Sequence, residues 1–446
     1  MRRLWYHRNP AAVHARKKPW PSFRALLNII GPGFITGAAD DDPSGIATYS
    51  QTGAQFGFGQ LWTALYQVPL LLAVQECCGR IGAVCCKGLA GVIKEHYSRK
   101  VLIGLVLLVM AANIINIGAD IGAVAAAAQL VYPAPFWLFA VVTVITVTSL
   151  EIWVTYPAYA NILKWLALAL LAYPATALMV AHDWGTILRA TFIPHFEFSF
   201  AFLFIITGVM GTSISPYMFF WQASEEVEEE EAIAAREGKS GPLQLPQHFI
   251  RNMRIDTTVG MVSSQLVQWF IIITTGTVLF SHGIKTINTA ADAAAALEPL
   301  VKSFPNAGQL ARDIFAFGII GLGLLAIPVL AGSGAYALAE ALNWKVGLSR
   351  KFSEAPGFYG IILVATLVGL AMDFVGIDPI KALVYTAVFN GIAAVPLLYI
   401  LARINGRADI LGENRGGLLS RIVVWLAFAV MAIASAALIY TTIRGG

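Results

Sequence analysis

The stretch Gly37–Ser50, GAADDDPSGIATYS, places three consecutive aspartates and a proline inside a segment that is otherwise apolar or small. A charge at membrane depth is costly, so it usually faces a cavity or a partner. Proline and glycine free backbone groups that are tolerated at depth only where they line a cavity. The run Asp42–Gly45 therefore predicts a helix broken at a carboxylate, with oxygen ligands suited to a hard cation. The alternative is a helix that ends here, with the acids in a surface loop, but the mostly apolar or small residues 46–57 argue against an early exit.

The composition indicates a chain that lies largely within a membrane. Apolar residues make up 57% of the 446 residues and charged residues only 13%, whereas soluble domains carry about 25% charged residues. Apolar runs close to bilayer thickness recur along the chain. We expect an all-α polytopic membrane protein with eleven transmembrane helices, near 25–57, 60–83, 101–131, 134–152, 156–181, 198–223, 255–281, 309–341, 357–375, 379–402 and 422–443.

The distribution of basic residues predicts the orientation. Residues 1–24 are basic and carry no acid, and no short apolar run with a small-residue cleavage site follows them, so they do not form a cleavable signal peptide. With this tail in the cytoplasm, 24 of the 30 Lys and Arg residues fall on the cytoplasmic side. The six on the outer side are Arg189, Lys285, Lys302, Arg312, Lys381 and Arg444. Since Lys/Arg bias sets orientation, we predict a multi-pass protein of the cytoplasmic (inner) membrane with its C-terminus outside.

A second interrupted helix is predicted within 198–223. Its apolar flanks enclose a run of small residues and a proline, Gly208, Gly211, Thr212, Ser213, Ser215 and Pro216. Secondary transporters often contain two inverted repeats, each with one broken helix beside the substrate. The pattern predicts a first repeat at 25–181, a second at 198–402 and an additional helix at 422–443. Taken alone, the second break also fits a simple proline kink.

Several motifs resemble one transporter family over nearly the whole chain. Gly31–Phe34, GPGF, followed by Asp42-Pro43, is similar to its first-helix signature, GPGF and then Asp-Pro-Gly-Asn. The runs 74–76, 80–82 and 87–90 look like the end of its second helix and the following loop. The chain thus resembles the Nramp family (natural resistance-associated macrophage proteins), which are proton-coupled divalent-metal transporters. The resemblance implies a LeuT-type fold in which helices one and six are unwound around the metal.

The chain departs from the family at the positions that hold the metal. The resemblance keeps the aspartate as Asp42 but places Gly45 at the asparagine position. The sixth-helix motif Met-Pro-His corresponds to Ser215-Pro216-Tyr217, so both the thioether and the imidazole are replaced. Third-helix acids of the family align with Asn116 and Ala119, with Asp120 one step away. In these losses the chain resembles the Nramp-related magnesium transporters.

The implied ligand set contains oxygen only. It comprises Asp42, Ser215, backbone carbonyls near Ala39 and Ile214, and water, with Gly45 and Tyr217 beside them. A thioether favours transition metals, and a hydroxyl removes that preference. Such a site suits Mg²⁺, Mn²⁺ or Ca²⁺, and the lost Met and Asn side chains would leave room for a hydrated ion. The missing histidine and third-helix acid predict weak or absent proton symport.

Five further acids are candidates for a proton carrier or a vestibule: Asp40, Asp41, Asp120, Glu225 and Glu226. Successive helical residues point about 100° apart, so the three aspartates cannot all face one ion. An aspartate near a helix start is also favoured by the dipole, so either Asp40 or Asp41 alternatively caps the second half-helix. The run 225–231 is alternatively a solvated acidic segment.

No catalytic motif appears in the sequence, and we expect no enzyme, no cofactor and no nucleic-acid partner. The preferred function is secondary transport of a divalent metal, with manganese and magnesium as candidates, by a monomer in the lipid bilayer. Two alternatives stay open: a transporter of the same fold for an organic cation or amino acid, and a sensor that binds a cation without moving it.

Overall fold

The computed structural model describes residues 32–154, 168–236, 247–376 and 378–444, and every regular element in these ranges is a helix. The helices are α2 (Pro32–Asp40), α3 (Pro43–Phe56), α4 (Thr63–Cys85), α5 (Leu89–His96), α6 (Arg99–Val131), α7 (Phe136–Trp153), α9 (Ala172–Val180), α10 (Trp184–Phe192), α11 (Phe200–Ser213), α12 (Pro216–Arg236), α13 (Gln247–Val278), α14 (Ala290–Ala294), α15 (Glu298–Val301), α16 (Ala307–Leu342), α17 (Pro356–Met372), α18 (Pro379–Asn405), α19 (Ala408–Leu411) and α20 (Leu418–Ile443). Short 3₁₀ turns are Leu168–Leu171, Phe280–His282, Ala295–Leu297, Asp373–Val375 and Gly412–Asn414.

The described helices agree with the predicted membrane spans. Eight helices are long and apolar enough to cross a membrane when α11 and α12 are taken together, and α17 is a shorter apolar helix. The interruption predicted at the aspartates separates α2 from α3, and each half is too short to be counted among the eight. The predicted tail 1–24, the start of the first span and residues 156–167 of the fifth span lie outside the described residues. The total of eleven therefore stays a prediction.

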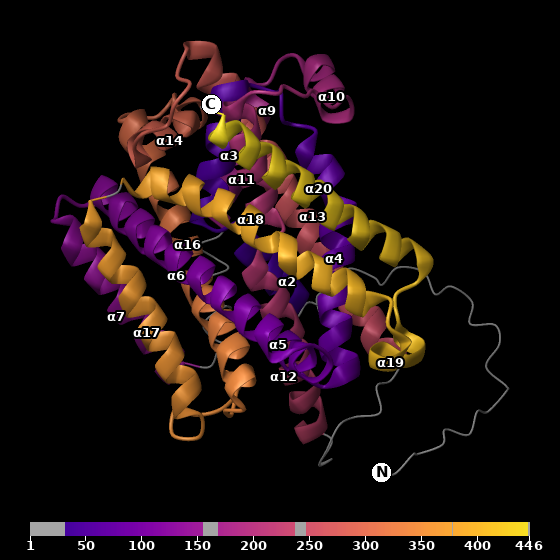
Figure 1. The fold of residues 1–446 in the computed structure, drawn as a ribbon. Helices are drawn as coiled ribbons and strands as arrows, with labels where there is room; N and C mark the ends of the chain where they lie inside the picture. Colours follow the sequence, from indigo (N-terminus) through magenta and orange to yellow (C-terminus); the bar gives the residue numbers. More distant parts are fainter. Residues whose placement is uncertain (1–31, 155–167, 237–246, 377, 445–446) are drawn as a thin grey trace, which may run out of the picture.

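The connections between helices lie in two groups at opposite ends of the bundle (Figure 1). Helices α9, α10 and α14 gather at one end, and α5, α19 and the end of α12 gather at the other. Helices α6, α7 and α17 form one flank, while α18 and α20 pack together on another. The two broken helices lie between these flanks, where α2 packs along α13 and α11 packs along α18.

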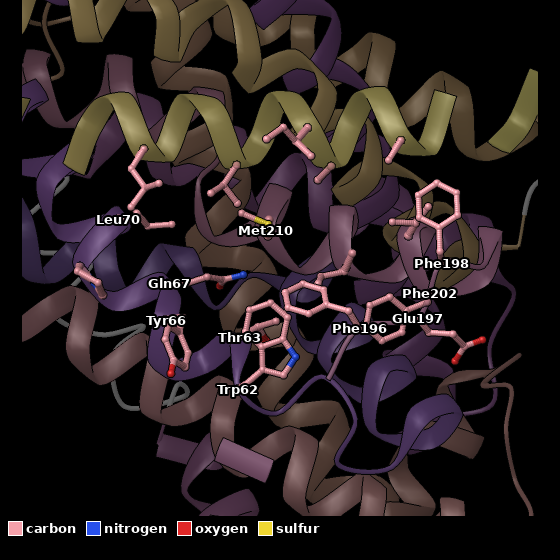
Figure 2. Close-up of a pocket in the computed structure, with 18 residues that line it drawn as sticks. Trp62, Thr63, Tyr66, Gln67, Leu70, Phe196, Glu197, Phe198, Phe202 and Met210 are labelled. Atoms are coloured by element: carbon pink, nitrogen blue, oxygen red, sulfur yellow. The ribbon is translucent and has the colours of Figure 1, made fainter. Parts of the chain in front are cut away.

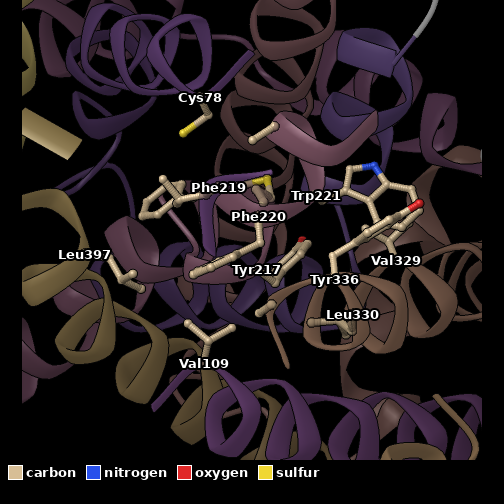
Figure 3. Close-up of a cluster of buried hydrophobic side chains, with 14 of the residues drawn as sticks. Cys78, Val109, Tyr217, Phe219, Phe220, Trp221, Val329, Leu330, Tyr336 and Leu397 are labelled. Atoms are coloured by element: carbon tan, nitrogen blue, oxygen red, sulfur yellow. The ribbon is translucent and has the colours of Figure 1, made fainter. Parts of the chain in front are cut away.

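Aromatic side chains at the start of α12 fill the core on one side of the second break (Figure 3). Tyr217, Phe219, Phe220 and Trp221 are each at most 1% exposed. They pack among side chains of α4, α6, α16 and α18, which include Cys78, Val109, Val329, Leu330, Tyr336 and Leu397. Lipid tails are as apolar as these residues, so the cluster stabilises the bundle through close packing rather than through burial from water.

Glycines bring the broken helices against their neighbours with backbones in contact. A Cβ atom on Gly37 of α2 would lie 2.4 Å from the carbonyl carbon of Gly260 on α13. A Cβ atom on Gly211 of α11 would lie 2.1 Å from the carbonyl oxygen of Ala387 on α18. Small residues at such crossings are typical of membrane helix packing.

Gly211→Ala is expected to destabilise the fold, because the added methyl group overlaps backbone that cannot rotate away. Overpacking of this kind costs about 1–3 kcal/mol. The measurement is thermal unfolding of the purified protein in detergent. Gly104→Ala on α6 is the matched control, since nothing lies within 4 Å of its Cβ position. Equal melting temperatures for the two variants would contradict the close α11–α18 crossing.

Candidate cation site at the two helix breaks

The first break separates α2 from α3, and the side chain of Asp42 stabilises it. This residue has extended backbone, with φ −63° and ψ 170°, and caps the N-terminus of α3. Its Oδ1 accepts hydrogen bonds from the Gly45 amide at 2.7 Å and the Ser44 hydroxyl at 2.6 Å. The proline at position 43 suits the first turn of a helix, where its missing N–H costs nothing. The predicted broken helix is therefore present, and the capping role expected for Asp40 or Asp41 belongs to Asp42.

The second break lies at Ile214 and Ser215, between α11 and α12. Ile214 ends α11 outside the helical region, and its amide donates to the carbonyl of Met210 at 2.9 Å. The Ser215 hydroxyl donates back to the carbonyl of Gly211 at 2.8 Å. The hydroxyl oxygen of Ser215 keeps lone pairs with which it can bind a cation.

Three pairs of residues join the two breaks directly. The Tyr217 hydroxyl donates to the carbonyl of Ala39 at 2.9 Å, and the hydroxyls of Tyr49 and Ser213 lie 3.1 Å apart. A Cβ atom on Gly45 would lie 3.2 Å from the Thr212 hydroxyl. The structure thus brings the site residues Asp42, Gly45, Ala39, Ile214, Ser215 and Tyr217 into one buried region, since each is at most 1% exposed or is buried glycine.

Two details differ from the site expected from the sequence. The Ala39 carbonyl, expected to face a metal, instead accepts the hydrogen bond from Tyr217. The Gly45 position does not provide extra room, because the Asp40 carbonyl, the Thr212 hydroxyl and the Tyr49 ring all lie 3.2–3.3 Å from where a Cβ would be. A glycine at this position therefore lets the two breaks pack together.

The α6 side of the first break carries three buried oxygens without hydrogen-bond partners among the described residues; Asp40 Oδ1 and the Thr212 hydroxyl, also at the breaks, have none either. Asn116 donates its amide to Asp42 Oδ2 at 3.1 Å, while its own Oδ1 has no hydrogen-bond partner among the described residues. Asp120, one turn further along α6, is fully buried, and neither of its carboxylate oxygens has a partner there. Asp42 and Asp120 act electrostatically on each other. A desolvated carboxylate of this kind needs a cation or a proton.

From the sequence, Asn116 aligns with an acid of the family, but its contact with Asp42 is not predicted. The signal was its spacing from Asp120, because residues four apart share one face of a helix. Asn113, one turn before Asn116, instead joins α6 to α16, since it donates to the Leu330 carbonyl and the Ser333 hydroxyl.

Asp40 and Asp41 point to a different neighbour. The Ser264 hydroxyl of α13 contacts the carboxylates of both residues, at 3.2 Å from Asp41 Oδ1. Both aspartates are at most 4% exposed. Their separation from the α6 side agrees with the expectation that the three aspartates cannot face one ion.

The acidic run after the second break is part of α12 rather than a solvated loop. Glu226 is 0% exposed and accepts a hydrogen bond from Gln222 at 2.8 Å. Glu228 accepts from the amides of Leu348 and Ser349 and from the Tyr336 hydroxyl. The side chain of Glu225 is partly buried. The alternative of a freely solvated segment is therefore wrong for these residues, because α12 continues against α16 and the loop that follows it.

The donor set at the breaks is mixed and poor in soft ligands. In the described ranges, no three His, Cys, Asp or Glu side chains form a group that could hold a metal ion. A cation here would combine carboxylate, carboxamide and hydroxyl oxygens from Asp42, Asn116, Asp120 and Ser215. Met210 and Met218, the methionines on either side of the second break, belong to the apolar core instead.

Two broken helices that contact each other within a helical bundle define a membrane transporter of LeuT-like fold. The fold is similar to that of the Eremococcus coleocola manganese transporter, with a TM-score of 0.74 at 16% identity over 94% of this chain and 87% of that one. MHP1, a nucleobase-cation-symport-1 family transporter, aligns with a TM-score of 0.53 at 12% identity over 92% of this chain and 93% of its own.

Sequence comparison identifies the family. The model for "Natural resistance-associated macrophage protein-like" matches residues 33–441. The divalent metal cation transporter MntH of Caldanaerobacter subterraneus subsp. tengcongensis is 24% identical over 95% of both chains. The protein of the same name from Bacillus subtilis is 22% identical over 95% of this chain and 94% of its own. The chain therefore belongs to the Nramp family, whose members are membrane transporters rather than enzymes and carry metal as substrate.

Proposed function

We propose that this protein is a secondary transporter of divalent metal cations, with an oxygen-only site that favours hard ions such as Mg²⁺ or Mn²⁺ and with weak or no proton coupling. The observation that carries the proposal is the group formed by Asp42, Asn116 and Asp120. It gathers buried oxygens without hydrogen-bond partners beside a helix break. Buried polar atoms of this kind are normally satisfied, and a cation would satisfy them.

The choice of hard cations rests on the chemistry of the donors. Carboxylate and amide oxygens suit Mg²⁺, Ca²⁺ and Mn²⁺, whereas thioethers favour softer transition metals. The second break presents the Ser215 hydroxyl, and its flanking methionines are packed in the core. Mg²⁺ dehydrates reluctantly and is often bound through one or two carboxylates and several waters, which matches a site with two carboxylates.

The proposed orientation places the end of the bundle with α5, α19 and the end of α12 in the cytoplasm (Figure 1). Lys87, Lys94, Arg407 and Arg415 lie in or next to α5 and α19, in agreement with the excess of basic residues expected on that side. We further propose that the protein resides in the cytoplasmic membrane as a monomer and moves metal inward.

The test is metal influx into liposomes that contain the purified protein. Mg²⁺ and Mn²⁺ are followed with internal dyes while the internal pH is recorded. We expect influx of both ions without acidification. Acidification in step with Mn²⁺ influx would overturn the proposed lack of proton coupling and point to Asp40 or Asp41 as proton carriers. No influx by folded protein would favour an organic substrate or a sensor.

Asp120→Asn is expected to slow metal uptake while leaving the fold intact. The change removes one buried charge, keeps the side-chain volume and leaves the Asn116–Asp42 hydrogen bond in place. We expect uptake at low metal concentration to fall by at least roughly 10–100-fold, the loss caused by removing even a group that supports a metal ligand. Asp378→Asn is the control, because Asp378 caps α18 through the amides of Ile380 and Lys381 and, within the part of the chain that the structure describes, forms no hydrogen bond with the proposed cation ligands. Unchanged uptake in Asp120→Asn would remove this residue from the site.

A further inference from the structure

A large apolar cavity lies along α11, and Met210, four residues before the second break, forms part of its wall. It has a volume of about 650 Å³ and is bounded by α4, α11, α20 and residues 196–198, which precede α11 (Figure 2). Its walls are almost wholly apolar, with Phe202, Ile206, Leu426, Val430 and Ile433 among them. Because α4, α11 and α20 belong to segments long and apolar enough to cross a membrane, we expect lipid around the cavity.

One polar side chain points into this apolar space. Gln67 of α4 is 2% exposed, and neither its amide nitrogen nor its carbonyl oxygen has a hydrogen-bond partner among the described residues. Figure 2 shows its amide directed into the cavity between Met210 and Thr63. A buried carboxamide without partners is costly, so the position favours an occupant that carries a polar group along an apolar body.

A second pocket adjoins the cavity and has the opposite chemistry. Its volume is about 660 Å³, and Phe198 lines both spaces. Arg444 lies in its wall, with its guanidinium 4.6 Å from the centre of the Tyr440 ring. Ser199 and Phe200 in the same wall form the N-terminus of α11, a helix of 14 residues. A helix N-terminus and an arginine both favour a phosphate group.

The rim also carries one carboxylate and two interfacial aromatic residues. Glu197 lines the apolar cavity next to Phe198. Trp62 and Tyr66, on the same wall, donate hydrogen bonds to the backbone carbonyls of His195 and Phe192. Trp and Tyr gather at the level of lipid headgroups, so this end of the cavity lies near the membrane surface.

We propose that the two pockets form a binding site for one phospholipid with an ammonium-bearing headgroup. One acyl chain occupies the apolar cavity, and the Gln67 amide donates to an ester carbonyl oxygen. The phosphate lies between Arg444 and the start of α11, and Glu197 attracts the ammonium. The site thus joins α20 to α4 and α11 through a lipid, and none of the proposed cation ligands lines either pocket.

The experiment measures lipid retained by the full-length protein. Wild-type protein is reconstituted in equal amounts of phosphatidylethanolamine and phosphatidylglycerol, extracted in mild detergent, washed and analysed by mass spectrometry. We expect about one phosphatidylethanolamine per chain to survive washing, since proteins have few such sites. Arg444→Gln is expected to lower retention by roughly tenfold, the effect of losing a charged hydrogen bond. Ala434→Phe, which fills the cavity, should lower it as much.

Ala436→Phe is the matched control, because Ala436 is exposed on the same helix and does not line the cavity. It should retain lipid like the wild type. The melting temperature of each variant establishes that it is folded. Retention in Ala434→Phe equal to that in Ala436→Phe would overturn the site. The site would also be overturned if the wild type retained no phospholipid, or if it retained alkyl detergent instead of phospholipid. Retention of phosphatidylglycerol instead would overturn the roles of Glu197 and the ammonium.

Discussion

Asp42→Asn is expected to abolish metal uptake while the protein still folds. Asparagine caps a helix about as well as aspartate, so the hydrogen bonds from Ser44 and the Gly45 amide can persist and keep the first break in place. The change removes the carboxylate charge that accepts the Asn116 hydrogen bond, beside the unpaired oxygen of that residue. A neutral ligand cannot offset the dehydration of a divalent ion in a buried site.

The expected decrease in uptake exceeds about 100-fold, since loss of a direct ligand costs more than loss of a supporting group. The assay is initial Mn²⁺ and Mg²⁺ influx into liposomes, together with metal binding by calorimetry. If the variant kept both metal binding and influx, the metal site would lie away from the break. If it kept binding but lost influx, Asp42 would act only in the movement of the ion.

Asp183→Asn is a matched control for the capping role. Asp183 caps α10 in the same manner, accepting hydrogen bonds from the amide and the hydroxyl of Thr186, but it is fully exposed and lies outside the membrane-spanning segments. These hydrogen bonds hold its pKa below the usual value for an aspartate. Its substitution tests loss of a charged helix cap alone, and we expect uptake to be unchanged.

The sequence predicted both helix breaks, because each is specified by neighbouring residues. Asp42-Pro43 contains a cap and a first-turn proline, and Ser215-Pro216 ends one helix and begins the next. Signals of this kind depend on local chemistry and can be recognised without a fold. The family resemblance then placed the breaks in a transporter fold, in agreement with the comparisons.

The partners of the site residues could not be predicted in the same way. Asp42 meets Asn116 across 74 positions, Tyr217 meets Ala39 across 178, and Ser264 meets Asp40 across 224. These contacts depend on how α6, α12 and α13 are rotated about their axes. A strongly apolar helix shows little periodicity from which a rotation can be read.

The acidic run of α12 illustrates the same limit. Six glutamates within residues 225–231 are typical of a solvated segment. Glu228 instead accepts hydrogen bonds from the Tyr336 hydroxyl and from the backbone amides of Leu348 and Ser349, more than a hundred residues away. Only the folded chain shows that Glu228 joins α12 to the loop after α16.

Ser215→Met is expected to change which metal the protein prefers. The residue lies at the second break and is fully buried, and its hydroxyl oxygen keeps lone pairs with which it can bind a cation. A thioether binds soft and borderline ions better than hard ones. We therefore expect uptake of Cd²⁺ relative to Mg²⁺ to rise by about tenfold, which corresponds to about 1.4 kcal/mol.

Ser215→Ala separates the gain of sulfur from the loss of the hydroxyl. It removes the hydrogen bond to the Gly211 carbonyl without adding a soft ligand, so it should lower uptake of all metals and leave their order unchanged. Competition between Cd²⁺ and Mg²⁺ is measured in liposomes for the wild type and both variants, with melting temperatures as the check on folding. If Ser215→Met kept the wild-type order while remaining folded, residue 215 would not face the ion. The hardness of the site would then depend on the α6 side alone, on Asn116 and Asp120.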